Sequence, residues 1–140
     1  MAGIRRPLLW VQCPAGAALI EQIPSAAGVL QRTDRFEAYP EGDPAVISAQ
    51  ISKLKTAADL VVYCNQGLAN AAQDEIKASL VVDHGVDLAR FASAGDGLAP
   101  TPHDLKDIRG ARVGFIGGID AHTFDPELFR SVAERLPRTQ

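Results

Sequence analysis

The feature that most constrains this fold is a series of short apolar runs, each three or four residues long, spread along the chain. Within each run the apolar residues are nearly continuous instead of alternating with polar ones, which is typical of strands buried on both faces. The runs are too short to be helices. They therefore predict parallel β-strands, at Leu8–Val11, Gly28–Leu30, Leu60–Tyr63, Leu80–Val82 and Val113–Ile116.

The segments between these runs carry helix signals. In the longest of them, apolar residues recur at intervals of four, three and four, which gives one apolar helix face. Asp43 and Pro44 precede it as a favourable N-cap and first-turn residue. Asp125 and Pro126 begin a second helix in the same way, and Pro137 limits its extension. Together with two weaker patterns, these signals predict helices over 14–23, 44–58, 65–77 and 125–137.

Strands that alternate with helices predict an α/β fold, here a Rossmann-like parallel sheet with flanking helices. Residues 1–91 hold four of the predicted strands and form a first unit. Residues 92–104 are rich in glycine, proline and small polar residues, which predicts a linker. Residues 105–140 hold one strand and one helix, too little to bury a core alone. We therefore expect this piece either to add a fifth strand to the first sheet or to begin an incomplete second domain.

Composition and charge exclude several classes of partner. The chain has 14 basic and 17 acidic residues, a net charge of −3 and no basic stripe, so we expect no nucleic acid partner. Its longest apolar stretch is far below the ~20 residues of a membrane helix, so we expect no transmembrane segment. Because Gln12 interrupts the apolar region too early for a secretory leader, the expected location is cytoplasmic. Cys13 and Cys64 lack the spacing of a metal or redox site, and we expect both to be reduced and packed.

The last predicted strand runs directly into a pair of glycines, Gly117 and Gly118, followed by Ile119 and Asp120. Paired glycines let the backbone turn tightly and bring its N–H groups close to a ligand, which suits a diphosphate. The alternative is that the glycines only reverse the chain. The spacing does not match G-x-G-x-x-G, and the chain has no P-loop motif, so neither a dinucleotide dehydrogenase nor a P-loop NTPase is indicated.

Two further groups of polar residues follow predicted strands, at the edge where ligands bind in open α/β sheets. His84, Gly85 and Asp87 form a turn after the fourth strand, in which His84 is either a general base or ligand, or a structural residue. Asp34 follows the second strand and is either a site residue or half of a solvated pair with Arg35. The histidines lack metal-binding spacing, and we expect no metal.

These segments together resemble a glycosyltransferase of the GT-B fold, family 4 type (group 1 glycosyl transferases). In that family the first domain closes on an Asn-Gly-Val-Asp-x-x-x-Phe turn, crosses a linker, and opens the second domain with a strand and a glycine turn. His84–Phe91 matches the turn, with His84 in place of the usual asparagine. The resemblance spans nearly the whole chain, through Leu9–Asp34, Leu60–Asn65, Val81–Phe91, Val113–Gly118 and Phe124–Pro137.

The resemblance implies a partial GT-B architecture and transfer of a sugar from a nucleotide-sugar donor to an acceptor, with no metal and no other cofactor. The donor nucleotide would be bound by Gly117, Gly118, Ile119 and Asp120. Gly117 and Gly118 match the turn whose amides face the diphosphate and stabilise its charge as the sugar acquires oxocarbenium character. Asp34 would be the catalytic residue that orients the acceptor or the donor sugar, and His84, Gly85 and Asp87 would form a structural turn. We expect the family's phosphate-binding basic residues and E-x-x-x-x-x-x-x-E carboxylates beyond Gln140, and therefore no turnover by these residues alone.

Two alternatives stay open beside this interpretation. The first is a non-catalytic α/β binding or interaction module that keeps a residual phosphate-binding turn. In the second, exposed strand edges pair with those of other chains, so that the protein is an oligomer.

Overall fold

A computed structural model describes residues 5–72, 77–97, 99–120 and 123–140 of the protein. The chain divides into two compact units, Met1–Gly85 and Val86–Gln140. In the described residues no helix is both long and apolar enough to cross a lipid bilayer.

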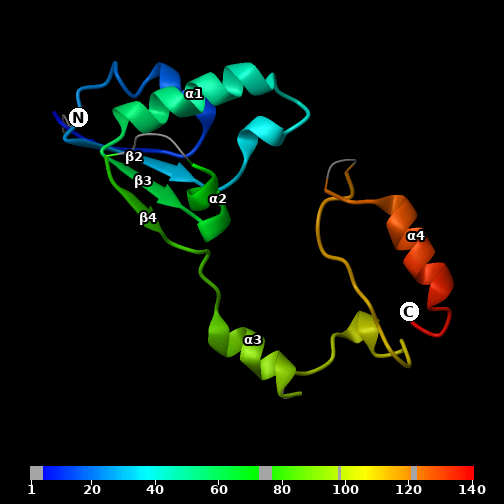
Figure 1. Ribbon diagram of the computed structural model, residues 1–140. Helices are drawn as coiled ribbons and strands as arrows, with labels where there is room; N and C mark the ends of the chain where they lie inside the picture. The colour runs from blue at the N-terminus through cyan, green and yellow to red at the C-terminus, as the bar shows by residue number, and fades with distance from the viewer. Residues whose placement is uncertain (1–4, 73–76, 98, 121–122) are drawn as a thin grey trace. The chain divides into compact units, whose positions relative to one another are not determined.

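The first unit is built on a parallel sheet, which confirms the α/β fold class (Figure 1). Its four strands lie in the order of the sequence, with β1 beside β2, β2 beside β3 and β3 beside β4. Each strand falls on or within one or two residues of a predicted run. Their bounds are β1 Leu8–Val11, β2 Ala27–Arg32, β3 Leu60–Tyr63 and β4 Ser79–Val81.

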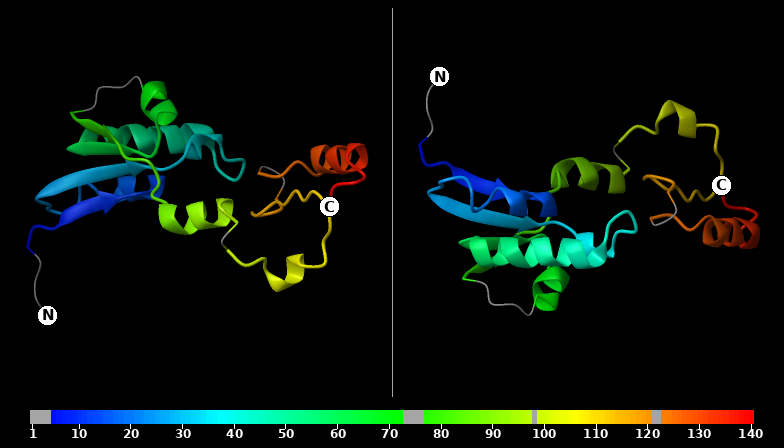
Figure 2. Two further views of the ribbon diagram at one scale, coloured as in Figure 1. Left: turned by 90° about the horizontal axis from the view of Figure 1, so that it is seen from below. Right: turned by 90° about the horizontal axis from the view of Figure 1, so that it is seen from above.

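Helix α1, Pro44–Ala57, is the longest element of this unit and forms where the sequence predicts it. The carboxylate of Asp43 accepts hydrogen bonds from the backbone N–H groups of Ala45 and Val46, at 2.8 and 3.3 Å. These bonds satisfy two of the N–H groups that have no partner inside the helix. Figures 1 and 2 show α1 running alongside the strands in all views.

The other two predicted helices of the first unit are shorter than expected. Residues 14–23 form only a 3-10 turn, η1 Pro14–Ala18, because the N–H groups of Gly16 and Leu19 bond to carbonyls three residues back. Helix α2 spans Gln66–Ala71 and is capped by the Asn65 side chain, which accepts from the Leu68 N–H at 2.8 Å. The rest of the 65–77 prediction includes residues 73–76, which lie outside the described residues. A second 3-10 turn, η2 Phe36–Ala38, follows β2.

The core of the first unit lies between α1, η1 and one face of the sheet. Leu54 of α1 is fully buried, at 0% exposure. It belongs to a cluster that includes Leu30 and Val61, which are paired in register on neighbouring strands and so share a face. Gly28 lies on the same face, and a methyl group there would be 3.6 Å from Ile20. The sheet and α1 are therefore closely packed around Leu54.

The second unit contains two helices, α3 Leu88–Gly95 and α4 Pro126–Arg135, and a 3-10 turn, η3 His103–Leu105. Helix α3 extends into the 92–104 segment that the sequence predicts to be a linker. Helix α4 lies within the predicted 125–137 helix, and Asp125 caps it by accepting from the N–H groups of Glu127 and Leu128 at 3.0 and 2.9 Å. No described residue of this unit is buried.

The prediction of a strand at Val113–Ile116 is wrong. Among the described residues the sheet of the first unit has four strands, and residues 113–116 are not assigned to any strand. A strand is defined by pairing with a neighbour, and an apolar run does not supply the neighbour. The backbone on either side of Arg112 bonds to Gln140 instead. The Gln140 N–H donates to the Ala111 carbonyl at 3.0 Å, and the Val113 N–H donates to the Gln140 carbonyl at 2.9 Å.

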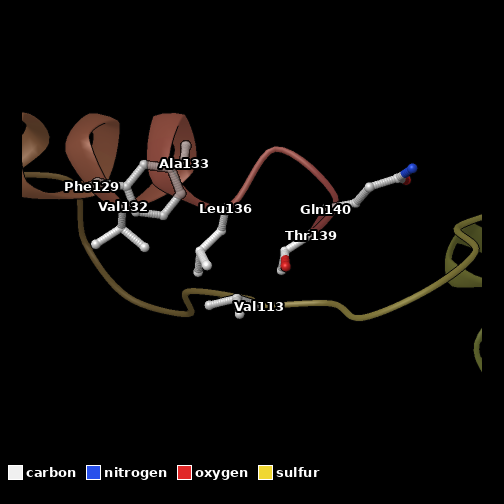
Figure 3. Close-up of a pocket in the computed structure, with 7 residues that line it drawn as sticks. All are labelled: Val113, Phe129, Val132, Ala133, Leu136, Thr139 and Gln140. Carbon is white, nitrogen blue, oxygen red and sulfur yellow. The ribbon is translucent and has the colours of Figure 1, made fainter.

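These two hydrogen bonds have the pattern of a parallel ladder, in which one residue bonds to both neighbours of its partner. In the chain, α4 lies between the two sides of this single bridge. Figure 3 shows Phe129 and Val132 of α4, and Leu136 directly after it, on the side of the helix that faces Val113. They line a cavity of about 70 Å³ between the helix and residues 113 and 139–140. One parallel bridge and this apolar contact therefore hold residues 111–113 and Gln140 close to α4.

Replacing Leu54 with alanine should destabilise the protein by about 2–5 kcal/mol, because it leaves a cavity between α1 and the sheet. The matched control is Val46→Ala in the same helix, where the side chain is 53% exposed and the effect should stay within about 0.5 kcal/mol. Urea unfolding followed by circular dichroism measures both. Equal effects of the two substitutions would contradict the described packing of α1.

Candidate functional site

Asp34 lies just after β2, at the carboxyl end of the sheet. Its carboxylate accepts a hydrogen bond from the Tyr39 hydroxyl and another from the Arg35 backbone N–H, the second at 2.9 Å. Tyr39 reaches it because η2 turns the chain back, and the ring of Tyr39 packs edge-on against that of Phe36 with centroids 5.8 Å apart. The segment from Thr33 to Tyr39 therefore holds an oriented, solvent-exposed carboxylate.

The hydrogen bond from Tyr39 and that from the Arg35 N–H, helped by the charge of Arg32, hold the pKa of Asp34 below its ordinary value. Asp34 is thus ionised at neutral pH. A carboxylate with a lowered pKa is a weak base and has no proton to donate. It is suited to accept hydrogen bonds from hydroxyl groups, such as those of a sugar, and poorly suited to general acid–base catalysis.

The predicted glycine turn, Gly117–Asp120, belongs to the second unit and is exposed throughout. A methyl group at Gly117 would lie 2.9 Å from Cζ of Phe115, and one at Gly118 would lie 2.9 Å from Oδ2 of Asp120. A methyl group at either position would therefore displace the end of an exposed side chain. Neither glycine has a positive φ.

Asp120 takes part in the structure of this turn. Its Oδ1 accepts from the backbone N–H of Thr123 at 2.9 Å and from the Thr123 hydroxyl at 2.7 Å. The side chain of Ile119 is exposed. Residues 121 and 122, between Asp120 and Thr123, lie outside the described residues. The side chain of Asp120 is thus held within the turn, which leaves the backbone amides as the groups that can meet a ligand.

His84, Gly85 and Asp87 lie in the connection between β4 and α3, where no turn is assigned. Asp83 accepts from the His84 backbone N–H at 2.7 Å, and Asp87 caps α3 by accepting from the Arg90 N–H at 3.0 Å. Nothing lies within 4 Å of a methyl group placed on Gly85, so no close contact requires glycine there. The boundary between the two units falls directly after Gly85, which leaves Asp34 in one unit and the glycine turn in the other.

The cysteines differ from each other in burial. Cys64 is buried and its thiol donates to the Thr33 carbonyl at 3.0 Å, as expected of a packed residue. Cys13 is exposed, so the prediction that it is packed was wrong. It follows the edge strand β1, where no further strand of the described chain covers it. In the described part of the chain, no three metal-binding side chains come together.

One cluster of charged residues escaped the sequence analysis. Arg32, the last residue of β2, is buried at 5% exposure, and its Nη2 bonds to both carboxylate oxygens of Glu37 at 3.2 Å. Lys55, in the last turn of α1, is buried at 8% exposure and lines a small cavity together with Arg32 and Glu37. The sequence pattern could have indicated both residues. Arg32 is two residues after the buried Leu30 on a strand, and Lys55 is four residues after the buried Ile51 on a helix, so each lies on the core-facing side.

No family model matches the chain, and neither a curated protein nor a solved structure was found to be similar to it.

Replacing Tyr39 with phenylalanine should raise the pKa of Asp34 toward its ordinary value of 3.8, because the strongest hydrogen bond to the carboxylate is lost. A lowered pKa means that ionised Asp34 stabilises the fold above its ordinary pKa, and that this contribution disappears as the pH falls through the folded-state value. The variant should therefore lose less stability on acidification. The carboxyl NMR signals of both proteins, followed against pH, measure the shift.

Asp59 provides the internal control for this experiment. Its pKa is also lowered, but by the Gly28 backbone N–H and by Lys77, neither of which the substitution touches. An Asp34 pKa that does not change in the variant, or that moves together with the pKa of Asp59, would contradict the assigned role of Tyr39.

Proposed function

We propose that this chain acts in the transfer of a sugar from a nucleotide-sugar donor to an acceptor, as a glycosyltransferase of the GT-B type. In this proposal the turn Gly117–Asp120 holds the diphosphate of the donor, and Asp34 orients a sugar hydroxyl. The metal-free mechanism and the cytoplasmic location belong to the same proposal.

The observation that carries the proposal is the pair of parallel hydrogen bonds between Gln140 and residues 111 and 113. They form one parallel bridge between the segment before the glycine turn and a residue after α4, which is the kind of contact that a β-α-β crossover makes. In open parallel α/β sheets, ligands bind at this position, beyond the carboxyl end of a strand. A nucleotide-binding half of a two-domain enzyme is built from such units.

The local electrostatics indicate which groups of the second unit would bind the diphosphate. The first N–H groups of α4 already bond to the carboxylate of Asp125, and Glu127 adds a negative charge in the first turn. The end of α4 is therefore not open to an anion. The backbone amides of Gly117 and Gly118 remain, and without side chains they allow close approach of a phosphate.

A non-catalytic interaction module is favoured by a different observation. Large apolar side chains are exposed on the first unit, and register pairing places them on the sheet face opposite Leu30 and Val61. Among the described residues β1 and β4 are also the sheet edges, which is where an oligomer would pair. An exposed apolar face of this kind is typical of an interaction surface. Its large members are Leu8, Trp10, Leu80 and Val82.

The test of the proposal is nucleotide binding by the full chain. Titration calorimetry with UDP, GDP and ADP should detect saturable binding of at least one of them, and at 100 times its Kd this ligand should stabilise the fold by ~2.7 kcal/mol. Gly117→Ala should weaken binding about tenfold or more, because the new methyl group displaces the turn or the Phe115 ring and one charge-assisted hydrogen bond is worth about 1.5–3 kcal/mol.

Gly114→Ala is the matched control, since nothing lies within 4 Å of a methyl group at that position. Its affinity for the nucleotide should equal that of the unchanged chain. If no nucleoside diphosphate binds, or if both alanine variants lose binding equally, the turn is not the donor site and the interaction module becomes the better description.

A further inference from the structure

The buried guanidinium of Arg32 has more hydrogen-bond donors than the described partners use. Its Nη2 is engaged by Glu37, at 3.2 Å from each carboxylate oxygen. Among the described residues its Nε and Nη1 have no hydrogen-bond partner, although both atoms are shielded from solvent. Buried N–H groups of a charged side chain are costly to leave unpaired, so such groups in a folded protein point to a further partner.

These donors border a cavity of about 40 Å³ at the carboxyl end of β2. One water needs about 10–15 Å³ by a comparable measure, so the cavity has room for about three oxygen-sized groups. Its walls come from β2, η2, α1, the end of β3 and α2. The cavity is therefore formed where several elements of the first unit meet, and not by one loop alone.

The charges around this cavity are mainly positive. Besides Arg32, its walls include the buried Lys55 and the exposed Arg35, and Glu37 is the one acidic residue among the described lining residues. Burial raises the pKa of Glu37, but a backbone hydrogen bond and the bonds to Arg32 outweigh it, so that Glu37 is an anion. The carboxylate of Glu37 is thus one negative charge beside the two guanidinium groups of Arg32 and Arg35.

We propose that this cavity is a binding site for a phosphoryl group, held by Arg32 from within and by Arg35 from the solvent side. A guanidinium presents its N–H groups in a fixed fork that matches the spacing of phosphate oxygens. Two unpaired N–H groups on Arg32, space for about three oxygens and a second guanidinium at Arg35 fit a phosphoryl group, which has three oxygens, better than a carboxylate, which has two. The site lies wholly in the first unit and does not depend on the proposed donor turn.

The experiment uses inorganic phosphate as the probe and isotope-labelled full chain. The Arg32 Nε–H signal should shift in a saturable way as phosphate is added, and an equal ionic strength of sodium chloride should not reproduce the shift. Arg35→Gln should weaken phosphate binding about tenfold and leave the fold intact, because Arg35 is exposed. Arg32→Gln should abolish binding, and its circular dichroism shows whether it still folds.

Lys53→Gln is the matched control for the loss of one positive charge. Lys53 lies on α1 like Lys55, but its Nζ bonds to Glu21 at 2.8 Å and it does not line the cavity. This variant should bind phosphate as the unchanged chain does. Gly117→Ala should also keep phosphate binding, which separates this site from the proposed donor turn.

Two results would overturn the proposal. If phosphate produces no saturable shift of the Arg32 signal, the unpaired donors are met by water alone. If Lys53→Gln weakens binding as much as Arg35→Gln, phosphate associates with the general charge of the surface. Binding of a sugar phosphate at least as tight as that of inorganic phosphate would support the proposal and identify a phosphomonoester as the natural ligand.

Discussion

The packing of α1 against the sheet supports the rest of the first unit. Parallel strands cannot be joined by tight turns, so each pair needs a crossover that also covers the sheet. Leu54 provides the contact: it is fully buried against the face formed by Leu30 and Val61. Because α1 is packed on this face, the position at which the chain leaves β2 is fixed. The Asp34–Tyr39 and Arg32–Glu37 pairs both form there.

The same packing explains why charged residues can be buried beside an apolar core. Arg32 shares the α1-facing side of β2 with Leu30, because residues two apart on a strand point to the same face. Its guanidinium is stabilised by Glu37, which η2 brings back toward the strand. Asp34 lies two residues further and stays in solvent, where Tyr39 orients it. One stretch of eight residues therefore holds an exposed carboxylate and a buried cation.

The second unit is held together differently. None of its described residues is buried, and its order comes from helix caps, three packed phenylalanine rings and the hydrogen bonds of Gln140. Hydrophobic burial is the main source of folding free energy, so a unit with so little of it is expected to open easily. If a phosphate bound to the backbone amides of the glycine turn as proposed, these contacts would stabilise the folded form of this unit. Ligand binding and the stability of this unit are therefore expected to be coupled.

The sequence by itself determined the elements that depend on local interactions. The parallel strands, α1 and α4 follow from apolar runs and from the Asp-Pro pairs at 43–44 and 125–126, since capping and periodicity act within a few residues. The tertiary structure decided everything that depends on a partner far along the chain. Val113–Ile116 has the apolar character of a strand, yet its pairing depends on Gln140, and the exposure of Cys13 depends on β1 being an edge. Arg32 is the last residue of a strand, and the sequence does not show its burial. Packing against α1 and η2 makes it a buried cation with unpaired donors.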